Sequence, residues 1–269
     1  MATGEEGILM SLRHYDTYVE LEKPLRFANG KIPEVRSPEL FDHFTYGAGA
    51  LDSHVPQYWD TTETGAATAF APSTSEPGGA IIAVTGATTN NGQEVAGTAI
   101  MWQPSTMGKV VFEARAKFVG ATTATAGDFY LGLSDALTET NSLPYVFSAA
   151  SALTAHAPSD AALFCYSSIP TSGSLYSASG NLIGLITTKA DTDTVTATTV
   201  VKNSSYRVYR IEIDSLGNVT AFIDGTQVAY KPLAITAATK LTPYCAAVAK
   251  DSKALTATID YIRVYGQYV

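Results

Sequence analysis

The sequence predicts an all-β protein: a two-sheet antiparallel β-sandwich of jelly-roll type that follows an extended N-terminal arm. About a dozen short stretches alternate apolar and polar residues with a period of two, and turn-forming residues separate them. No stretch keeps a helical period long enough to predict a helix, and no internal repeat of roughly 20 to 50 residues is present. A sheet with one apolar face needs a second layer to cover it, so these strands predict a sandwich.

The clearest strand pattern runs from Tyr206 to Tyr230 and predicts a three-stranded meander. Turns are expected at Leu216-Gly217-Asn218 and at Asp224-Gly225. The alternation predicts one core-facing side, formed by Tyr209, Ile211, Ile213, Val219, Ala221 and Ile223. A meander of this kind is not stable alone in water, so a second sheet should cover its apolar face.

The remaining strands are expected on both sides of this meander. In chain order, the predicted strands are 80–85, 95–103, 108–120, 128–137, 162–167, 182–187, 195–201, 244–250 and 255–265. The pattern in 128–137 places Phe129, Leu131 and Leu133 on one side of the strand. The last strand is expected near the first one. The segment 137–188 is rich in Ser, Ala and Thr, and any binding loops are expected there.

Two parts of the chain differ in composition. Residues 1–40 are enriched in Glu and Arg, with six of the twelve Glu, three of the seven Arg and three prolines. They are interpreted as a docking or partner-binding arm, whereas residues 41–269 form the sandwich. An isolated arm would expose large apolar side chains, so these are predicted to pack on another surface. The candidate contact residues are Tyr15, Tyr18, Leu21, Leu25 and Phe27.

Charge and composition exclude several classes of partner. The net charge of −8 opposes electrostatic binding to nucleic acid or to an anionic membrane. The longest apolar runs are far shorter than the roughly 20 residues of a membrane span. The N-terminus lacks the basic and apolar regions of a secretory signal, so we expect synthesis in a cytoplasm. Cys165 and Cys245 lie in apolar strands without metal-ligand spacing and are expected to be buried thiols.

Motifs for metal, nucleotide or nucleophilic chemistry are missing from the sequence. The four histidines show no HxxxH or HExxH spacing, and no Gly-x-Ser-x-Gly elbow or Walker loop occurs. The clusters 90–94 and 191–193 offer oxygen ligands but lack the spacing of an EF-hand. We therefore expect no cofactor and no metal site.

Five segments carry a family resemblance. In order they are GTAIMWQP, GKVVFEARAKF, DFYLGLSDA, YRVYRIEIDSLGNVTAFIDGTQVA and ATIDYIRVYG. They resemble the concanavalin A-like lectin/glucanase sandwich, and more closely its version in tailed-bacteriophage structural proteins. The resemblance covers 41–266 and implies the same sandwich fold. It leaves function open, because lectins, glycosidases, lyases and virion proteins share this fold.

The carboxylates do not follow the pattern of the family's hydrolases. Glucanases with this fold place three acidic residues on one strand as Glu-x-Asp-x-x-Glu, and a retaining mechanism needs two carboxylates about 5 Å apart. No such pattern occurs here: Glu113, Asp128 and Asp135 are isolated in the sequence. Glu212 and Asp214 share a face with Arg210, which is typical of a solvated charged strand. The protein is therefore predicted not to be an enzyme.

The main hypothesis is a bacteriophage virion structural protein, most specifically a capsid decoration or cement protein located on the virion. Its arm would bind the major capsid protein or other virion proteins, and a homo-oligomer is expected, with a trimer assumed. The alternative is a carbohydrate-binding module or adhesin of a phage tail or fibre that binds glycans through Tyr58, Trp59 and Asp60, or through Tyr145 or Tyr176. The second alternative is a polysaccharide hydrolase or lyase.

Overall fold

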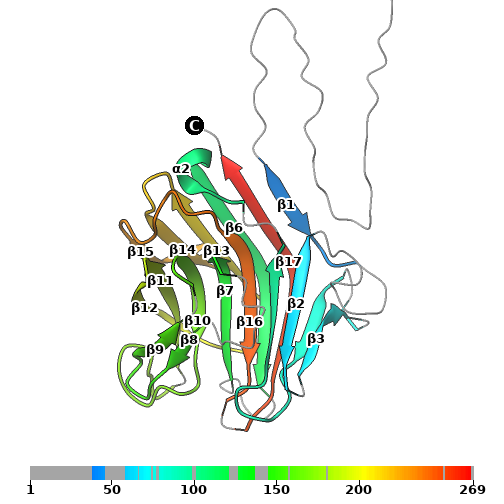
Figure 1. The fold of residues 1–269 in the computed structure, drawn as a ribbon. Coiled ribbons are helices and arrows are strands. Elements are labelled where there is room, and N and C mark those ends of the chain that lie inside the picture. The colour runs from blue at the N-terminus through cyan, green and yellow to red at the C-terminus, as the bar shows by residue number, and fades with distance from the viewer. Residues whose placement is uncertain are drawn as a thin grey trace, which may run out of the picture.

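The structure is a computed structural model that describes residues 38–45, 58–65, 67–73, 75–76, 79–98, 101–120, 127–136, 145–156, 158–179, 181–250 and 252–267. The predicted arm residues Tyr15, Tyr18, Leu21, Leu25 and Phe27 lie outside the described residues. Two antiparallel sheets pack face to face (Figure 1). The predicted all-β sandwich is therefore confirmed.

The first sheet has eight strands in the order β15-β14-β13-β6-β17-β4-β3, and β1 also pairs with β17. Its long central strands β6 and β17 run antiparallel over twelve and thirteen residues. The bounds are β1 (Glu39–Asp42), β3 (Thr68–Pro72), β4 (Ile81–Val84), β6 (Lys109–Gly120), β13 (Arg207–Asp214), β14 (Val219–Ile223), β15 (Thr226–Lys231) and β17 (Leu255–Gln267).

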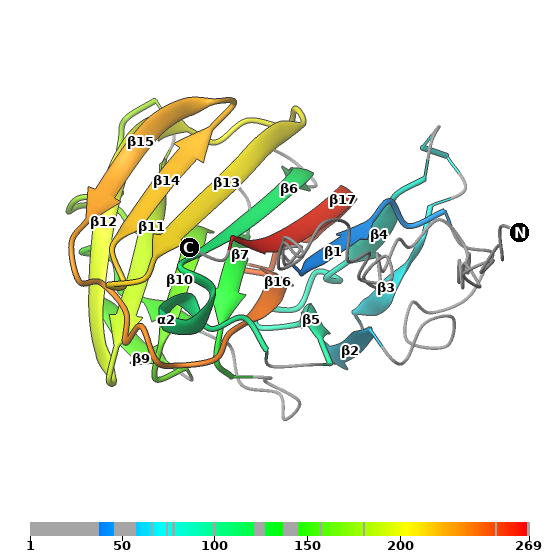
Figure 2. The same cartoon turned by 90° about the horizontal axis from the view of Figure 1, so that it is seen from above.

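The second sheet has seven strands in the order β12-β11-β10-β7-β16-β5-β2. Seen from above, β12 and β15 lie at the same side of the sandwich, where both sheets end (Figure 2). The bounds are β2 (Trp59–Thr64), β5 (Gly92–Gly97), β7 (Asp128–Ser134), β10 (Ala161–Tyr166), β11 (Leu182–Lys189), β12 (Thr192–Val201) and β16 (Thr242–Val248). A separate hairpin, β8 (Tyr145–Phe147) and β9 (Leu153–His156), and a one-turn helix, α2 (Pro104–Met107), complete the described elements. No described helix has the length and apolar character needed to cross a membrane.

Aromatic rings fill the core between the sheets. Phe118 from β6 stacks on Phe129 from β7 with ring centroids 3.9 Å apart. Tyr209 from β13 meets Phe164 from β10 edge to face at 5.2 Å. Each contact joins one sheet to the other, so these rings supply both buried apolar area and specific orientation.

The predicted meander is confirmed as β13, β14 and β15. All six predicted core positions are buried, because alternate residues of a strand point to opposite faces. Asp224 and Gly225 both have positive φ, at 50° and 79°, as a tight hairpin between right-twisted strands requires. The sequence was sufficient to predict this meander because the period-two alternation and the turn residues indicate the same strand limits.

Some predicted strands have different limits. The largest difference is in the expected strand 95–103, which is wrong at both ends: β5 begins at Gly92 and ends at Gly97. β12 begins at Thr192 rather than 195, and β16 covers Thr242–Val248 rather than 244–250. The start of β5 shifts because Gly92 pairs with Val248 on β16 and Thr64 on β2. Beyond the strand, Pro104 begins a helical turn, which its fixed φ favours at that position.

The predicted alternation of β7 is confirmed, but both faces of the strand are buried. Phe129, Leu131 and Leu133 pack in the core between the sheets, and all seven residues of the strand are buried. A second hydrophobic cluster covers the outer face of the seven-stranded sheet, with Tyr145 and Phe147 from β8 and Leu175 from the following loop packed on Tyr130 and its neighbours. The short-period pattern could not predict this layer, because it comes from a segment without strong strand signals.

The first and last strands lie side by side, as predicted. Glu39 to Asp42 of β1 pair with Tyr265 to Ile262 of β17, and the Gly266 N–H donates to the Pro38 carbonyl at 3.0 Å. Glu39 and Leu40, which were expected in the arm, therefore belong to the eight-stranded sheet.

Candidate binding pocket on the eight-stranded sheet

The outer face of the eight-stranded sheet carries a dense set of charged side chains. They alternate with the core residues of β6, β13 and β17, so they point away from the second sheet. The salt bridges on this face join Lys109 to Glu212 at 3.0 Å, Arg115 to Asp260 at 2.5 Å, Lys117 to Glu76 at 2.5 Å, Arg263 to Glu39 at 2.6 Å, and Arg210 to Glu212.

A pocket of about 210 Å³ lies among these side chains. Arg210 on β13 stands in register with Glu113 on β6 and with Phe222 on β14, so three adjacent strands place a cation, a carboxylate and a ring in one row. The lining residues are Glu113, Val208, Arg210, Glu212, Phe222 and Gly225. The pocket thus combines an apolar wall with groups that accept and donate hydrogen bonds.

Arg210 lies across the sheet beside the pocket. Its Nη2 donates to Glu212 and, at 3.5 Å, to the Tyr265 hydroxyl, and these two residues flank Val111. Val111 is only 1% exposed although it faces outward, which fits a guanidinium that covers it. The buried Nε of Arg210 has no hydrogen-bond partner within the described part of the chain.

Glu113 is the carboxylate with room for a further partner. Both residues opposite it are arginines, yet Arg210 pairs with Glu212 and Arg263 pairs with Glu39. Glu113 instead accepts a hydrogen bond from the Tyr261 hydroxyl at 3.0 Å. Burial and the bond to Glu113 both raise the pKa of Tyr261, so this hydroxyl stays a donor at neutral pH.

Glu212 is held in its ionised form. Burial raises its pKa, but the hydrogen bond from Lys109 and the charges of Arg210 and Lys109 together lower it below its ordinary value. A glycosidase needs one carboxyl group that is protonated near neutral pH to act as the general acid. Glu212, whose pKa is lowered, does not supply such an acid.

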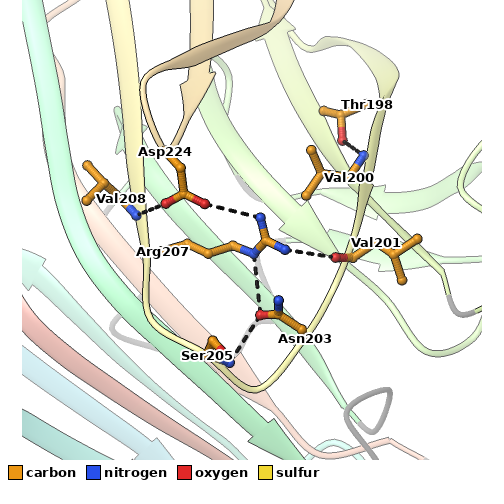
Figure 3. A network of polar contacts seen from close by, with 8 residues as sticks. All are labelled: Thr198, Val200, Val201, Asn203, Ser205, Arg207, Val208 and Asp224. Carbon is orange, nitrogen blue, oxygen red and sulfur yellow. Dashed lines mark hydrogen bonds and ion pairs between the residues drawn. The ribbon is translucent and has the colours of Figure 1, made fainter.

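A network centred on Arg207 fixes the rim of the pocket (Figure 3). Its Nη1 donates to Asp224 at 3.2 Å and its Nε to Asn203 at 3.4 Å. The backbone N–H of Val208 donates to the other oxygen of Asp224 at 2.9 Å. Because Val208 and Gly225 line the pocket, the network holds the β14-β15 turn and the β12-β13 loop in place around it.

The sugar-binding residues expected from the sequence do not form one platform. Trp59 is fully buried and donates its indole N–H to Asp42 at 2.7 Å, so its ring faces are not available to a ligand and this expectation is corrected. Tyr58 and Asp60 are half-buried neighbours. The adjacent aromatic and acidic residues resembled a sugar site in the sequence, but the strand turns Trp59 into the core.

The two tyrosines of the middle segment also differ in position. Tyr145 is buried and shares a hydrogen bond of 2.5 Å with Thr188, so it is a core residue rather than a ligand platform. Tyr176 is 46% exposed and remains available at the surface. Binding loops were expected in the segment 137–188, but the part of it that carries Tyr145 belongs to the second hydrophobic cluster.

Glu94, on the outer face of the seven-stranded sheet, was not singled out as a catalytic or binding residue from the sequence. Burial raises its pKa to about 8, against the opposing effect of a hydrogen bond with Tyr244. Shifts of this size occur at functional sites and also at structural ones. Nearby, buried Asp128 and Lys250 approach to 3.9 Å, and Lys250 donates to Asn90 at 2.9 Å. Over the described ranges, no group of three or more His, Cys, Asp or Glu side chains is placed to hold a metal.

The sequence alone does not bring Glu113 together with Arg210 and Glu212. Glu113 lies about a hundred positions before the other two in the chain, and only the pairing of β6 with β13 makes them neighbours. The sequence signal that could have identified these residues is that each one occupies an outward-facing position in an alternating strand. Phe222 had the same signal as a large ring on the polar side of its strand.

Comparison with known proteins supports the fold. No family model matches the chain, and no match is found among curated proteins. The chain is similar to the carbohydrate recognition domain of Emp46p in its potassium-bound form, with a TM-score of 0.53 and 9% identity over 82% of this chain and 94% of that one. The same domain of Emp47p gives a TM-score of 0.52 and 11% identity over 79% and 90%. A protein of unknown function, SO2946 from Shewanella oneidensis MR-1, gives a TM-score of 0.55 and 10% identity over 86% of this chain and 87% of that one. At these identities the likeness establishes a lectin-like β-sandwich.

Proposed function

We propose that this chain is a bacteriophage virion structural protein without enzymatic activity, of the capsid decoration or cement type. The sandwich is the rigid body, and residues 1–37 attach it to the major capsid protein or to other virion proteins. The observation that carries the proposal is the way the sandwich begins. Strand β1 is fixed to β17 along four residues and by the Pro38 carbonyl, so whatever binds residues 1–37 is connected to the whole body.

Three further observations support a rigid body rather than a catalyst. The outer face of the seven-stranded sheet is packed by the second hydrophobic cluster over β7, β10 and β16. The two carboxylates that share a pocket include one, Glu212, whose pKa is lowered and which is therefore a poor general acid. The five segments that resemble phage structural proteins all fall within 41–266.

Deletion of residues 1–37 tests the attachment. The truncated chain should keep its β-sheet circular dichroism and its melting temperature but should fail to join particles when the full chain is replaced by it. A matched variant, Phe222→Ala in the full chain, should be incorporated normally, because the pocket is not the attachment site. Incorporation of the truncated chain at the level of the full chain would contradict the proposal.

A second candidate function, glycan binding, is favoured by the pocket on the eight-stranded sheet. Phe222 offers a ring to the apolar face of a sugar, while Glu113 accepts and Arg210 donates hydrogen bonds to hydroxyl groups. The volume of about 210 Å³ is below the range of roughly 300–1,000 Å³ typical of drug-sized ligands, so the pocket fits a single sugar unit. The structurally similar Emp46p and Emp47p domains are carbohydrate recognition domains, although the likeness itself concerns the fold.

Glycan-array screening followed by calorimetric titration tests this second function. Binding should fall at least tenfold in Phe222→Ala and stay unchanged in Thr220→Ala, which alters the neighbouring outward position of β14. Binding that is lost equally in both variants would place the sugar elsewhere. Absence of any binding on the array would remove the candidate.

A further inference from the structure

Strand β12 is an unprotected sheet edge. Exposed edges present unpaired backbone N–H and C=O groups, and proteins normally protect them with charges, proline, bulges or short length. β12 is ten residues long, TDTVTATTVV, and contains one charged residue, Asp193, and no proline. In the described sheets, no strand pairs with it on the side away from β11. It lies at the outer margin of the sandwich (Figure 2).

The other strands at sheet ends are better protected. β3 is five residues long and contains Pro72. β2 contains Asp60 and Glu63. β15 is six residues long and carries Lys231. The register of β12 with β11 shifts between Leu182 and Gly184, but residues 192–197 pair regularly. β12 differs from the other edge strands because it is ten residues long and carries a single charge, although the whole chain has a net charge of −8. It is therefore the sheet edge best suited to pairing.

The hairpin that joins β11 to β12 defines which groups point outward. Lys189 pairs with Thr192 across a two-residue turn, Ala190-Asp191, in which both residues have positive φ. In such a hairpin the flanking pair is hydrogen-bonded, and hydrogen-bonded pairs then alternate along the ladder. Thr192, Thr194 and Thr196 therefore direct their backbone groups toward β11. The backbone groups of the intervening residues, Asp193, Val195 and Ala197, point to the free edge.

We propose that β12 pairs antiparallel with β12 of a second copy of this chain, with the two-fold axis at Val195. In this register Val195 faces the Val195 of the second copy, and Asp193 faces Ala197, so no like charges meet. Three outward residues per strand give about six backbone hydrogen bonds. Thr194 faces Thr196, a cross-strand combination that stabilises sheets.

The result is a continuous sheet across two sandwiches. The contact is isologous and closes on itself, as most homodimers do. It replaces the trimer assumed from the sequence with a two-fold pair, and it is independent of where residues 1–37 bind. The side chains of Val195 and Ala197 also remain available for the contact, because they pack only partly into the second hydrophobic cluster.

Light scattering of the full chain during gel filtration tests the proposal. The expected mass is twice 28.4 kDa. Val195→Lys places two cations at the axis and should shift the mass to that of one chain. Tyr230→Lys, an equal charge change at the exposed edge of the other sheet, should not. Both variants should keep the parental far-ultraviolet circular dichroism.

A cysteine pair tests the register directly. Residues in a hydrogen-bonded antiparallel pair have Cα atoms about 5.5 Å apart, which a disulfide can bridge. Val195→Cys should form a cross-linked dimer on mild oxidation, whereas Thr199→Cys on the same strand should not, and Cys165 and Cys245 are buried. A single-chain mass at all concentrations, or an oligomer that survives Val195→Lys and is not cross-linked by Val195→Cys, would overturn the proposal.

Discussion

The Trp59 indole donates its N–H to the Asp42 carboxylate at 2.7 Å, and both residues are fully buried. Asp42 belongs to β1 in the eight-stranded sheet and Trp59 to β2 in the seven-stranded sheet, so the bond joins the two layers. The other oxygen of Asp42 accepts the Phe44 backbone N–H at 2.8 Å. This contact ties β1, the first described strand, to the opposite sheet.

Trp59→Phe should destabilise the sandwich more than Trp102→Phe. Both variants shrink a buried ring, but only the first also removes a buried hydrogen bond, which costs about 1–3 kcal/mol. Urea unfolding followed by circular dichroism measures the difference between the two variants. Equal losses in the free energy of unfolding would show that the indole bond is not important.

Truncation should reveal the true start of the folded body. A chain that begins at Pro38 keeps β1 and should melt close to the full chain. A chain that begins at His43 loses β1 and Asp42, so it should melt at least several degrees lower. Calorimetry of the two truncations makes the comparison. Similar melting temperatures would contradict the role given to β1.

The free energy of unfolding should fall as pH rises from about 5 to about 8. Glu94 has a folded pKa of about 8 against an ordinary value of 4.5, so the folded state binds more protons over this interval. Its stabilising contribution is complete below about 4.5 and is lost as pH passes through about 8. Glu94→Gln should remove roughly 2 kcal/mol of this decline. Glu63→Gln, on the exposed side of β2, serves as the control and should leave the profile unchanged.

Arg207→Lys should loosen the rim of the pocket. Lysine cannot bridge Asp224, Asn203 and the Val201 carbonyl at once, so the free energy of unfolding should fall by about 1–2 kcal/mol. Arg263→Lys is the control: the side chain of Arg263 bonds to one carboxylate, Glu39, which a lysine can also reach, and a single exposed pair of this kind contributes little. Hydrogen exchange should rise at 202–206 and 224–225 only in Arg207→Lys. Identical exchange in both variants would contradict the network.

The parts of the fold that could be predicted are those where one physical signal acts alone. The β13-β14-β15 meander follows from period-two alternation and from turns that need positive φ at Asp224 and Gly225. The second hydrophobic cluster could not be predicted, because Tyr145 and Leu175 reach Tyr130 only through tertiary packing. For the same reason Trp59 resembled a sugar platform in the sequence: its neighbours Tyr58 and Asp60 are polar, but alternation places Trp59 in the core.

The pocket shows a similar limit. Glu113 and Glu212 were each interpretable as solvated strand residues, and only the register of β6 with β13 shows that they line one space. Register between distant strands depends on the whole core, so local patterns do not specify it.

Cryo-electron microscopy of purified source particles with and without this chain tests directly whether the protein decorates a virion. We expect regularly spaced densities of the size of the sandwich on the particle that disappear when the chain is removed, with the β1 and C-terminal side of each sandwich turned toward the shell. Particles that are identical in the two samples would contradict the proposal.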